Sequence, residues 1–288
     1  MQSLKARRVL RHWILMIDIL LLLIVPLCVL LALYVLSTVC RCGHKGLGAL
    51  QGWSYAHRGL HGDDAPENSL QAFQKAVDAG YGIELDVHLL ADGEMAIIHD
   101  SQLLRTTGME GCVEDLTADQ LKECFLEGTA YVIPLLRDVL RIVSGKVPLI
   151  VELKPNVSNY AALCKSVCDL LDSYDGTFCL ESFDPRCVFW LRRNRPDLIR
   201  GQLVQNYFAK ANSKLPWIIK WFLRNQSLNF LTKPDFVAYR YSDRKTVSNW
   251  IVRNLWKTPV VSWTLKNQEE YDIAVCEGWI PIFEGFLP

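Results

Sequence analysis

Short apolar segments of strand length alternate with segments of helical periodicity from Trp53 to the end of the chain. The strand candidates are 53–57, 82–87, 95–99, 148–153, 177–183, 200–204, 235–240, 259–263 and 280–283. Parallel neighbours in a barrel need a long crossover, but 82–87 and 95–99 are joined by a short connection that contains Asp92-Gly93, a hairpin signal. We therefore expect 95–99 to be an extra antiparallel strand. The remaining segments predict the α/β class, as a (β/α)₈ barrel of the TIM type.

The segments between these strands carry helix signals. Ser69 is placed to cap a helix that ends at Gly80, and Thr117-x-x-Gln120 has the form of a capping box for a helix over 118–127. Helical spacing continues over 135–144, 158–173, 186–194, 244–256 and 268–277.

The N-terminal part of the chain predicts a membrane anchor. A basic flank, residues 1–12, precedes an apolar run over 13–36 that is long enough to cross a bilayer. A cleaved signal peptide is the alternative, but its apolar region is usually shorter and ends in small residues. We therefore expect an uncleaved single-pass transmembrane helix at 13–36, a glycine-rich linker at 37–52 and the barrel domain at 53–288.

Charge and cysteine content bear on the compartment and on the partners. The formal net charge is zero, which argues against a general nucleic-acid binder. The basic flank places the barrel domain outside the cytoplasm by the positive-inside rule. Ten irregularly spaced cysteines without a CxxC pair predict buried thiols and favour a reducing compartment instead. We favour the extracytoplasmic side and leave the oligomeric state open.

Most of the residues suited to chemistry lie between Ala56 and Asp100. Glu84 and Asp86 stand two apart in the apolar run Ile83–Val87, so a strand there directs both carboxylates to one face. Two carboxylates on an inward face are costly unless a positive group lies between them. A divalent metal is the simplest such group, and oxygen ligands favour Ca²⁺ or Mg²⁺.

Several ordered motifs resemble those of the glycerophosphodiester phosphodiesterases. They are His57-Arg58-Gly59, Pro66-Glu67-Asn68-Ser69, Glu84-x-Asp86, His99-Asp100, Glu152-Leu153-Lys154, Ser182-Phe183 and Trp263-Thr264. The resemblance covers about residues 53–288 and implies a phosphodiesterase-type barrel. It implies hydrolysis of a glycerophosphodiester to glycerol 3-phosphate and an alcohol, as part of phospholipid metabolism.

With that chemistry, the resemblance assigns a role to each motif residue. His57 and His99 are expected to carry protons, because imidazole titrates near neutral pH. Arg58 and Lys154 are expected to bind the substrate phosphate, and Glu84, Asp86 and Glu152 the metal. Supporting roles fall to the remaining motif residues, which are Glu67, Asn68, Ser182 and Trp263.

Two positions are left with open roles. The family usually ends with a Thr-Asp pair after its last strand, and Glu284 is the acid that could replace it here. His88, two residues after Asp86, is a reserve metal ligand in strand register.

An apolar insert at 215–231 bears on one alternative function. We favour a helix buried against the barrel there, and an interfacial helix that touches lipid is the alternative. Lipid contact would suit a lysophospholipase D-type enzyme of the same fold. A catalytically inactive membrane scaffold is a second alternative, which the retained histidines and acids disfavour. A nuclease-like phosphodiesterase is disfavoured by the neutral charge.

Overall fold

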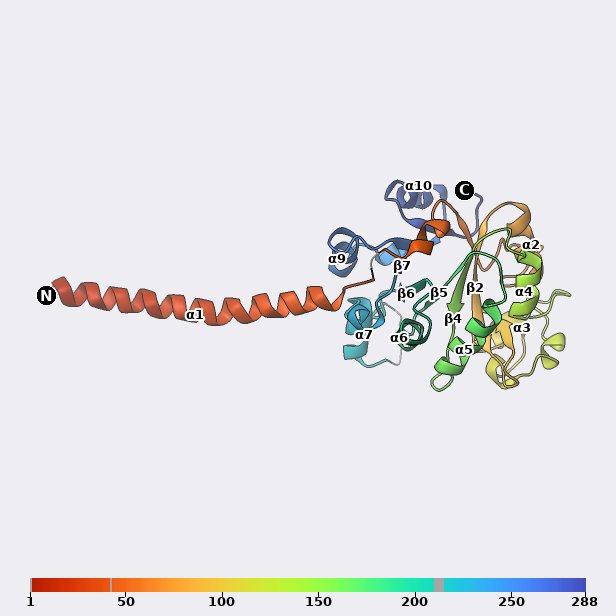
Figure 1. Cartoon of the computed structure of the whole chain (residues 1–288), viewed down its shortest axis with the longest axis horizontal. Helices are drawn as coiled ribbons and strands as arrows, with labels where there is room; N and C mark the ends of the chain where they lie inside the picture. Colours follow the sequence, from red (N-terminus) through yellow and green to blue (C-terminus); the bar gives the residue numbers. More distant parts are fainter. Residues whose placement is uncertain (1, 42, 210–214) are drawn as a thin grey trace.

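A computed structural model describes residues 2–41, 43–209 and 215–288. A long helix, α1 (Gln2–Ser37), extends away from a barrel domain that is built from the rest of the chain (Figure 1). The side chains of the predicted basic flank up to Arg11, and the whole of Cys42, lie outside the described residues.

The barrel is formed by eight parallel strands, and one further strand is antiparallel. In chain order the strands are β1 (Tyr55–His57), β2 (Gly82–Leu89), β3 (Met95–Ile97), β4 (Leu149–Leu153), β5 (Phe178–Ser182), β6 (Arg200–Val204), β7 (Phe236–Arg240), β8 (Val260–Leu265) and β9 (Ile280–Phe283). Strand β1 pairs in parallel with both β2 and β9, which closes the barrel. Strand β3 pairs with β2 in antiparallel register and lies at the end of the strand order. The predicted (β/α)₈ barrel with one extra hairpin strand is therefore confirmed.

Helices surround the barrel. They are α2 (Leu70–Asp78), α3 (Leu104–Thr107), α4 (Leu136–Val143), α5 (Tyr160–Leu171), α6 (Pro185–Asn194), α7 (Trp217–Arg224), α8 (Asn229–Thr232), α9 (Val247–Asn254) and α10 (Gln268–Cys276). Short 3₁₀ helices lie at η1 (Lys45–Leu50), η2 (Val113–Asp115), η3 (Gln120–Glu123) and η4 (Tyr241–Asp243). The predicted cap of α2 is present, since the Ser69 side chain accepts from the Ala72 backbone N–H.

The predicted helix over 118–127 is wrong. The Gln120 side chain does accept a hydrogen bond from the Thr117 backbone N–H at 2.8 Å, as in a capping box. Only the 3₁₀ helix η3 follows, because the next residues bond to a returning strand-like segment: Ile133 N–H donates to Cys124 O and Leu126 N–H to Tyr131 O. These residues pack in a small apolar cluster with β3, and this tertiary contact overrides the local helix signal.

The barrel interior is divided into an apolar half and a polar half. Tyr55, Ile150 and Phe236 pack near the amino ends of the strands, beside η1. Gly201 leaves room for this packing, because a Cβ there would lie 2.2 Å from the Phe236 ring. Towards the carboxyl ends, the inward positions become charged, and this half holds the candidate site.

Helix α1 contains one segment, His12–Ser37, that is long and apolar enough to cross a membrane, and none of its most apolar window is buried in the structure. Its C-terminal end joins the barrel domain between α7 and α9 (Figure 1). The expectation that 215–231 forms a helix buried against the barrel is wrong for α7, since no residue of α7 is buried.

None of the described cysteines forms a disulfide. Cys40, Cys124, Cys164, Cys168, Cys179 and Cys187 are buried, as predicted, whereas Cys28 and Cys276 are exposed and Cys112 is intermediate. Cys164 and Cys168 of α5 both pack in the main core, so their four-residue spacing reflects packing.

Candidate functional site

A cavity of about 950 Å³ opens at the carboxyl ends of the strands. It is lined by inward-facing residues of several strands and of the loops that follow them, among them His57, Glu84, His99, Glu152, Lys154, Glu181, Phe183, Tyr207, Trp263 and Glu284. The motif residues predicted from distant parts of the sequence are thus brought to one end of the barrel, where barrel enzymes carry their active sites.

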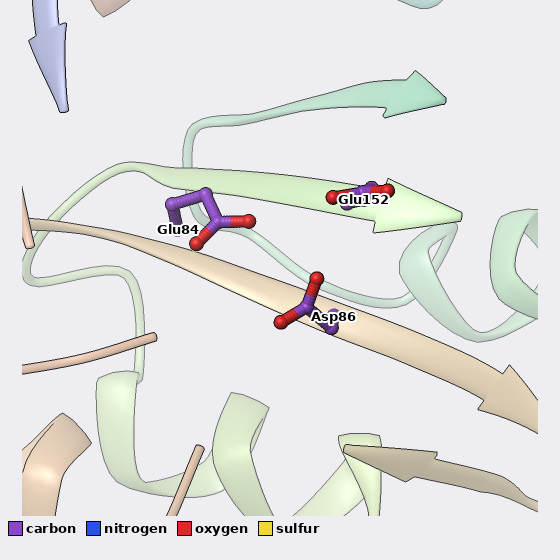
Figure 2. Close-up of side chains that lie close together, drawn as sticks. All are labelled: Glu84, Asp86 and Glu152. Atoms are coloured by element: carbon purple, nitrogen blue, oxygen red, sulfur yellow. The ribbon is translucent and has the colours of Figure 1, made fainter. Parts of the chain in front are cut away.

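Three buried carboxylates lie close together at this end of the barrel (Figure 2), and two of them, Glu84 and Glu152, line the cavity. Glu84 and Asp86 leave the same face of β2, and Asp86 is paired in register with Glu152 of β4. One oxygen from each carboxylate lies within 4.8 Å of the others. The period-two alternation predicted from the sequence is what brings these groups together.

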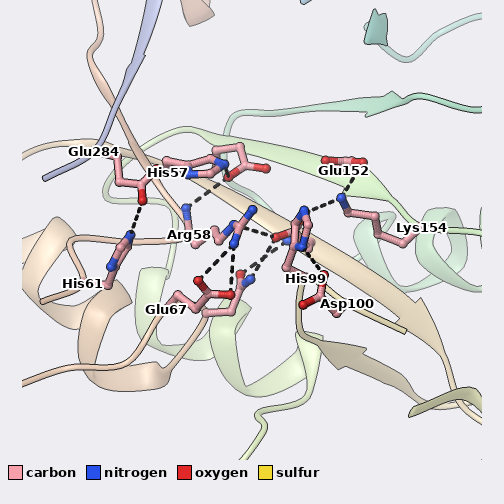
Figure 3. Close-up of polar contacts among 12 residues, drawn as sticks. His57, Arg58, His61, Glu67, His99, Asp100, Glu152, Lys154 and Glu284 are labelled. Carbon is pink, nitrogen blue, oxygen red and sulfur yellow. Dashed lines mark hydrogen bonds and ion pairs between the residues drawn. The ribbon is translucent and has the colours of Figure 1, made fainter. Parts of the chain in front are cut away.

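Cations and an amide surround the carboxylates (Figure 3). Lys154 Nζ lies 3.0 Å from Asp86 Oδ1 and 2.8 Å from Glu152 Oε1. The Arg58 backbone N–H donates to Glu84 at 3.0 Å, and its guanidinium Nε lies 3.5 Å from Asp86 Oδ2. Asn68 Nδ2 donates to Asp86 Oδ2 at 2.9 Å.

The pKa values of the three acids diverge because their neighbours differ. Burial raises the pKa of Glu84 well above its usual value, and the nearby Asp86 and Glu152 raise it further. Burial and Asp86 raise the pKa of Glu152 to about 7, although Lys154 opposes them. Burial also disfavours ionised Asp86, but Lys154, His99 and Arg58 outweigh it and hold that pKa below its usual value. Asp86 is therefore the carboxylate that stays charged most readily.

The cluster fits an oxygen-preferring divalent cation. Its donor set is three buried carboxylates, and Asp86 Oδ1 and Glu152 Oε1 share the single ammonium group of Lys154. A cation would supply the positive charge that like-charged buried acids need, and carboxylates are the ligands that Mg²⁺ and Ca²⁺ prefer.

His57 lies at the end of β1 between two carboxylates. Its Nδ1 forms a 2.8 Å hydrogen bond with Glu284 Oε2, and its Nε2 lies 3.9 Å from Glu84 Oε2. Burial lowers the pKa of His57, although Glu284 partly offsets it. The imidazole is therefore neutral at pH 7, with Nδ1 donating to Glu284 and Nε2 directed at the acidic cluster.

His99 follows the extra strand β3 and lines the same cavity. Its Nδ1 bonds to Asp100 at 2.7 Å, and Asp100 is in turn paired with Arg105. Burial lowers the pKa of His99 to about 4, against the opposing effect of Asp86. His88, the reserve ligand, instead bonds Glu114 through Nδ1 at 2.8 Å and lies outside the carboxylate cluster.

The residues expected to support the site occupy different places around it. Arg58 Nη1 donates to both oxygens of Glu67 at 3.0 Å, so Glu67 contacts Arg58 and not the carboxylate cluster. Ser182 Oγ donates to Leu153 O at 2.7 Å and ties the end of β5 to that of β4. The Trp263 ring packs edge-on against Phe183 at 5.4 Å, on the cavity wall.

Sequence reasoning missed one acid and the partners of two others. Glu181 faces the cavity beside Glu152, with which it pairs in register, and burial raises its pKa well above the usual value. The alternation of β5 could have identified it, because Cys179 and Glu181 share a face. No local signal joins Glu284 to His57, since they lie on β1 and beyond β9, which only barrel closure brings together. Arg105, which pairs with Glu67 at 2.6 Å, was not anticipated either.

Comparison with known families identifies one that covers most of the barrel. The model of the glycerophosphoryl diester phosphodiesterase family matches residues 57–279. A glycerophosphodiester phosphodiesterase of Bacillus altitudinis is 40% identical over 129 residues, which cover 42% of this chain and 52% of the relative. The chain thus matches about half the length of that protein. A lysophospholipase D of Rattus norvegicus is 33% identical over 132 residues, covering 41% of this chain and 40% of the relative.

The fold is also shared with solved structures. A phosphodiesterase of Oleispira antarctica, solved in complex with the product sn-glycerol-3-phosphate, aligns with a TM-score of 0.66 and 21% identity. The alignment covers 85% of this chain and 95% of that one. At this identity the likeness establishes the barrel fold.

Proposed function

Since the chain belongs to the glycerophosphoryl diester phosphodiesterase family, we propose that it hydrolyses glycerophosphodiesters to glycerol 3-phosphate and an alcohol. The observation that carries the proposal is the carboxylate cluster Glu84, Asp86 and Glu152, because Glu84 and Glu152 line the same cavity as His57 and His99. A binding or scaffold protein needs no proton carriers beside a metal site, so this combination disfavours the inactive alternative.

The three carboxylates would hold a divalent cation, with Mg²⁺ or Ca²⁺ as the candidates. Bound there, the cation supplies positive charge against the anionic phosphodiester, which otherwise repels nucleophiles. Lys154 and Arg58 add fixed positive charge on either side of Asp86. We assign both to the phosphate oxygens of the substrate, with Arg58 oriented by Glu67.

His57 is the residue we assign to accept the proton of the attacking hydroxyl. Its Nε2 is free to accept, because Nδ1 donates to Glu284, and Glu284 stabilises the imidazolium that forms. His99 is the second proton carrier, oriented in the same way by Asp100. An anionic substrate raises the pKa of both imidazoles, which lets one of them donate to the departing alcohol.

The remaining residues position this machinery. We propose that Asn68 orients Asp86, Ser182 joins the ends of two strands, and Trp263 forms an apolar wall for the alcohol. We also propose that residues 13–36 of α1 cross the bilayer, that 37–52 link them to the catalytic domain at 53–288, and that the domain faces the extracytoplasmic side.

The test is release of glycerol 3-phosphate from glycerophosphocholine by the full chain in detergent. His57→Ala should lower kcat by about 10² to 10⁴-fold, the usual contribution of one positioned acid–base group. His44→Ala is the matched control, because His44 bonds to Asp197 O away from the cavity and should leave the rate unchanged. Wild-type protein that releases no product with any divalent metal would contradict the proposal.

A second candidate activity, removal of the head group from lysophospholipids, is favoured by the exposed apolar helix α7 and by the lysophospholipase D relative. Parallel assays on lysophosphatidylcholine micelles and on glycerophosphocholine separate the two. The lipid is the preferred substrate if the wild type releases choline faster from the micelles than from glycerophosphocholine. In that case Trp217→Asp should lose the activity on micelles but keep the activity on glycerophosphocholine.

A further inference from the structure

Large apolar side chains are exposed on both sides of the point where α1 meets the barrel domain. Within the part of the barrel domain that the structure describes, the exposed tryptophans are Trp217 and Trp221 of α7 and Trp250 of α9, with 70%, 40% and 63% of their surface accessible. Val247 of α9 and Ile218 of α7 are exposed beside them. We call these five residues the rim.

One ring contact joins the rim to α1, and hydrogen bonds hold the residues just after α1 against the barrel domain. The Tyr34 ring of α1 lies 6.2 Å from the Trp221 ring, and Trp256 Nε1 donates to Thr38 Oγ1 at 3.0 Å. Arg41, just beyond α1, pairs with Asp235 and donates through Nη1 to Pro196 O at 2.6 Å. The C-terminal end of α1 is therefore held at a defined place on the domain.

The two helices of the rim are also joined to each other. Ser248 Oγ of α9 donates to Arg224 O of α7 at 3.4 Å, and Gln226 Nε2 lies 3.5 Å from Ser248 Oγ. Gln226 and Ser248 are buried, so the junction is packed. In Figure 1, α7 and α9 lie on opposite sides of the C-terminal end of α1, at the edge of the domain from which α1 extends.

The chemistry of the rim fits a lipid surface. Tryptophan is enriched at bilayer interfaces, where its ring is held in the head-group layer and its N–H stays hydrated. Neither α7 nor α9 contains an acidic residue, while Lys220 and Arg224 lie on α7; Arg253 of α9 is paired with Glu277. This combination of apolar and basic side chains is typical of helices that lie on anionic membranes.

We propose that the rim is a second membrane contact, through which α7 and α9 lie in the head-group layer around α1. The proposal goes beyond the phosphodiesterase activity and rests on the proposed crossing of the bilayer by α1. It has a consequence for access to the site, because Arg240, Tyr241 and Ser242 line the cavity and lead from β7 into α9. The cavity is then held beside the lipid surface.

The test is photo-crosslinking of the full chain in vesicles of phosphatidylcholine and phosphatidylglycerol. Benzoylphenylalanine is placed at position 217 or 250, at position 27 within α1, and at position 104, which is also exposed but lies on α3. We expect lipid adducts at 217, 250 and 27 and none at 104. Adducts at 27 alone, or equal adducts at 104, would overturn the proposal. Absence of adducts at every position would overturn it together with the anchor.

A second measurement avoids the bulky probe. Brominated phosphatidylcholine quenches tryptophan fluorescence only at short range, so the quenched fraction should fall when Trp217→Phe and Trp250→Phe are combined. Equal quenching in this variant and in the wild type would contradict contact between the rim and lipid. The combined variant should keep the wild-type rate on glycerophosphocholine, since neither residue lines the cavity.

Discussion

The two ends of the barrel interior are built from the same strands but differ in kind. Along β4, Ile150 points into the apolar half and Glu152 into the cavity, and along β5 Cys179 and Glu181 do the same. One step of two residues thus separates a packed hydrocarbon interior from a cluster of like charges. The apolar half stabilises the fold without taking part in chemistry, whereas the charged half is costly to fold and is where chemistry becomes possible.

The largest effect on activity is expected from a substitution of Glu84 in the charged half. Glu84→Gln keeps the shape of the side chain but removes one carboxylate from the cluster, so we expect kcat to fall by about 10² to 10³-fold through lost electrostatic stabilisation. Because burial, and then Asp86 and Glu152, disfavour an ionised Glu84, the metal-free variant should also unfold at a higher temperature than the metal-free wild type. Thermal unfolding by circular dichroism, beside the activity assay, measures both effects. If the variant lost both activity and stability, the charged half would not be costly to fold.

The opposite result is expected at Phe236 in the apolar half. Phe236→Ala removes a fully buried ring and should lower the free energy of unfolding by about 3–5 kcal/mol. Activity per folded molecule should stay near wild type, because Phe236 does not line the cavity. Urea unfolding in detergent gives the stability, and Phe189→Ala, at an exposed position, is the matched control. If Phe189→Ala lowered the free energy of unfolding equally, burial in the barrel interior would not explain the loss at Phe236.

A smaller effect on activity is expected at Glu284, which contacts His57 from outside the carboxylate cluster. Glu284→Gln should lower kcat by roughly 10 to 100-fold, as is usual for a residue that orients a functional group. Since Glu284 raises the pKa of His57, its loss should also move the acidic limb of the kcat/KM profile to lower pH. Glu277→Gln, at the exposed partner of Arg253, is the control and should change neither quantity. An unmoved acidic limb would argue that Glu284 is merely structural.

The mildest test of the charged half is pH. The pKa of Glu152 is raised from 4.5 to about 7 in the metal-free fold, so the folded state binds more protons than the unfolded state between these values. The stability that this proton contributes is present below pH 4.5 and is lost as the pH rises through about 7. Metal affinity should change in the opposite direction, rising with pH up to about 7, because the cation and the proton compete for Glu152. Calorimetric metal titrations at several pH values, with unfolding curves in EDTA, check both signs.

The barrel could be predicted from the sequence because its signals are local. Strand segments are short apolar runs, and the hairpin at Asp92-Gly93 correctly separated β3 from the parallel strands. The carboxylate pair followed from alternation alone, since Glu84 and Asp86 must share a face of β2.

What could not be predicted depends on contacts between distant segments. The contact of Glu284 with His57 exists only after the barrel closes, and the predicted helix at 118–127 lost to pairing of Cys124 with Ile133. The exposure of α7 was also missed, because an apolar helix reads the same whether it covers the barrel or faces outwards. Hydrophobic periodicity shows which face of a helix is apolar, but it does not show what that face packs against.

We propose that hydrolysis depends on a divalent metal held by Glu84, Asp86 and Glu152. The most direct measurement titrates EDTA-treated full chain with Mg²⁺ or Ca²⁺ and follows bound metal and glycerol 3-phosphate release in the same samples. We predict no release without metal, recovery in proportion to the metal bound, and loss of both in Glu84→Gln. Full activity after EDTA treatment, or metal-dependent activity that survives in Glu84→Gln at the wild-type metal affinity, would contradict the account.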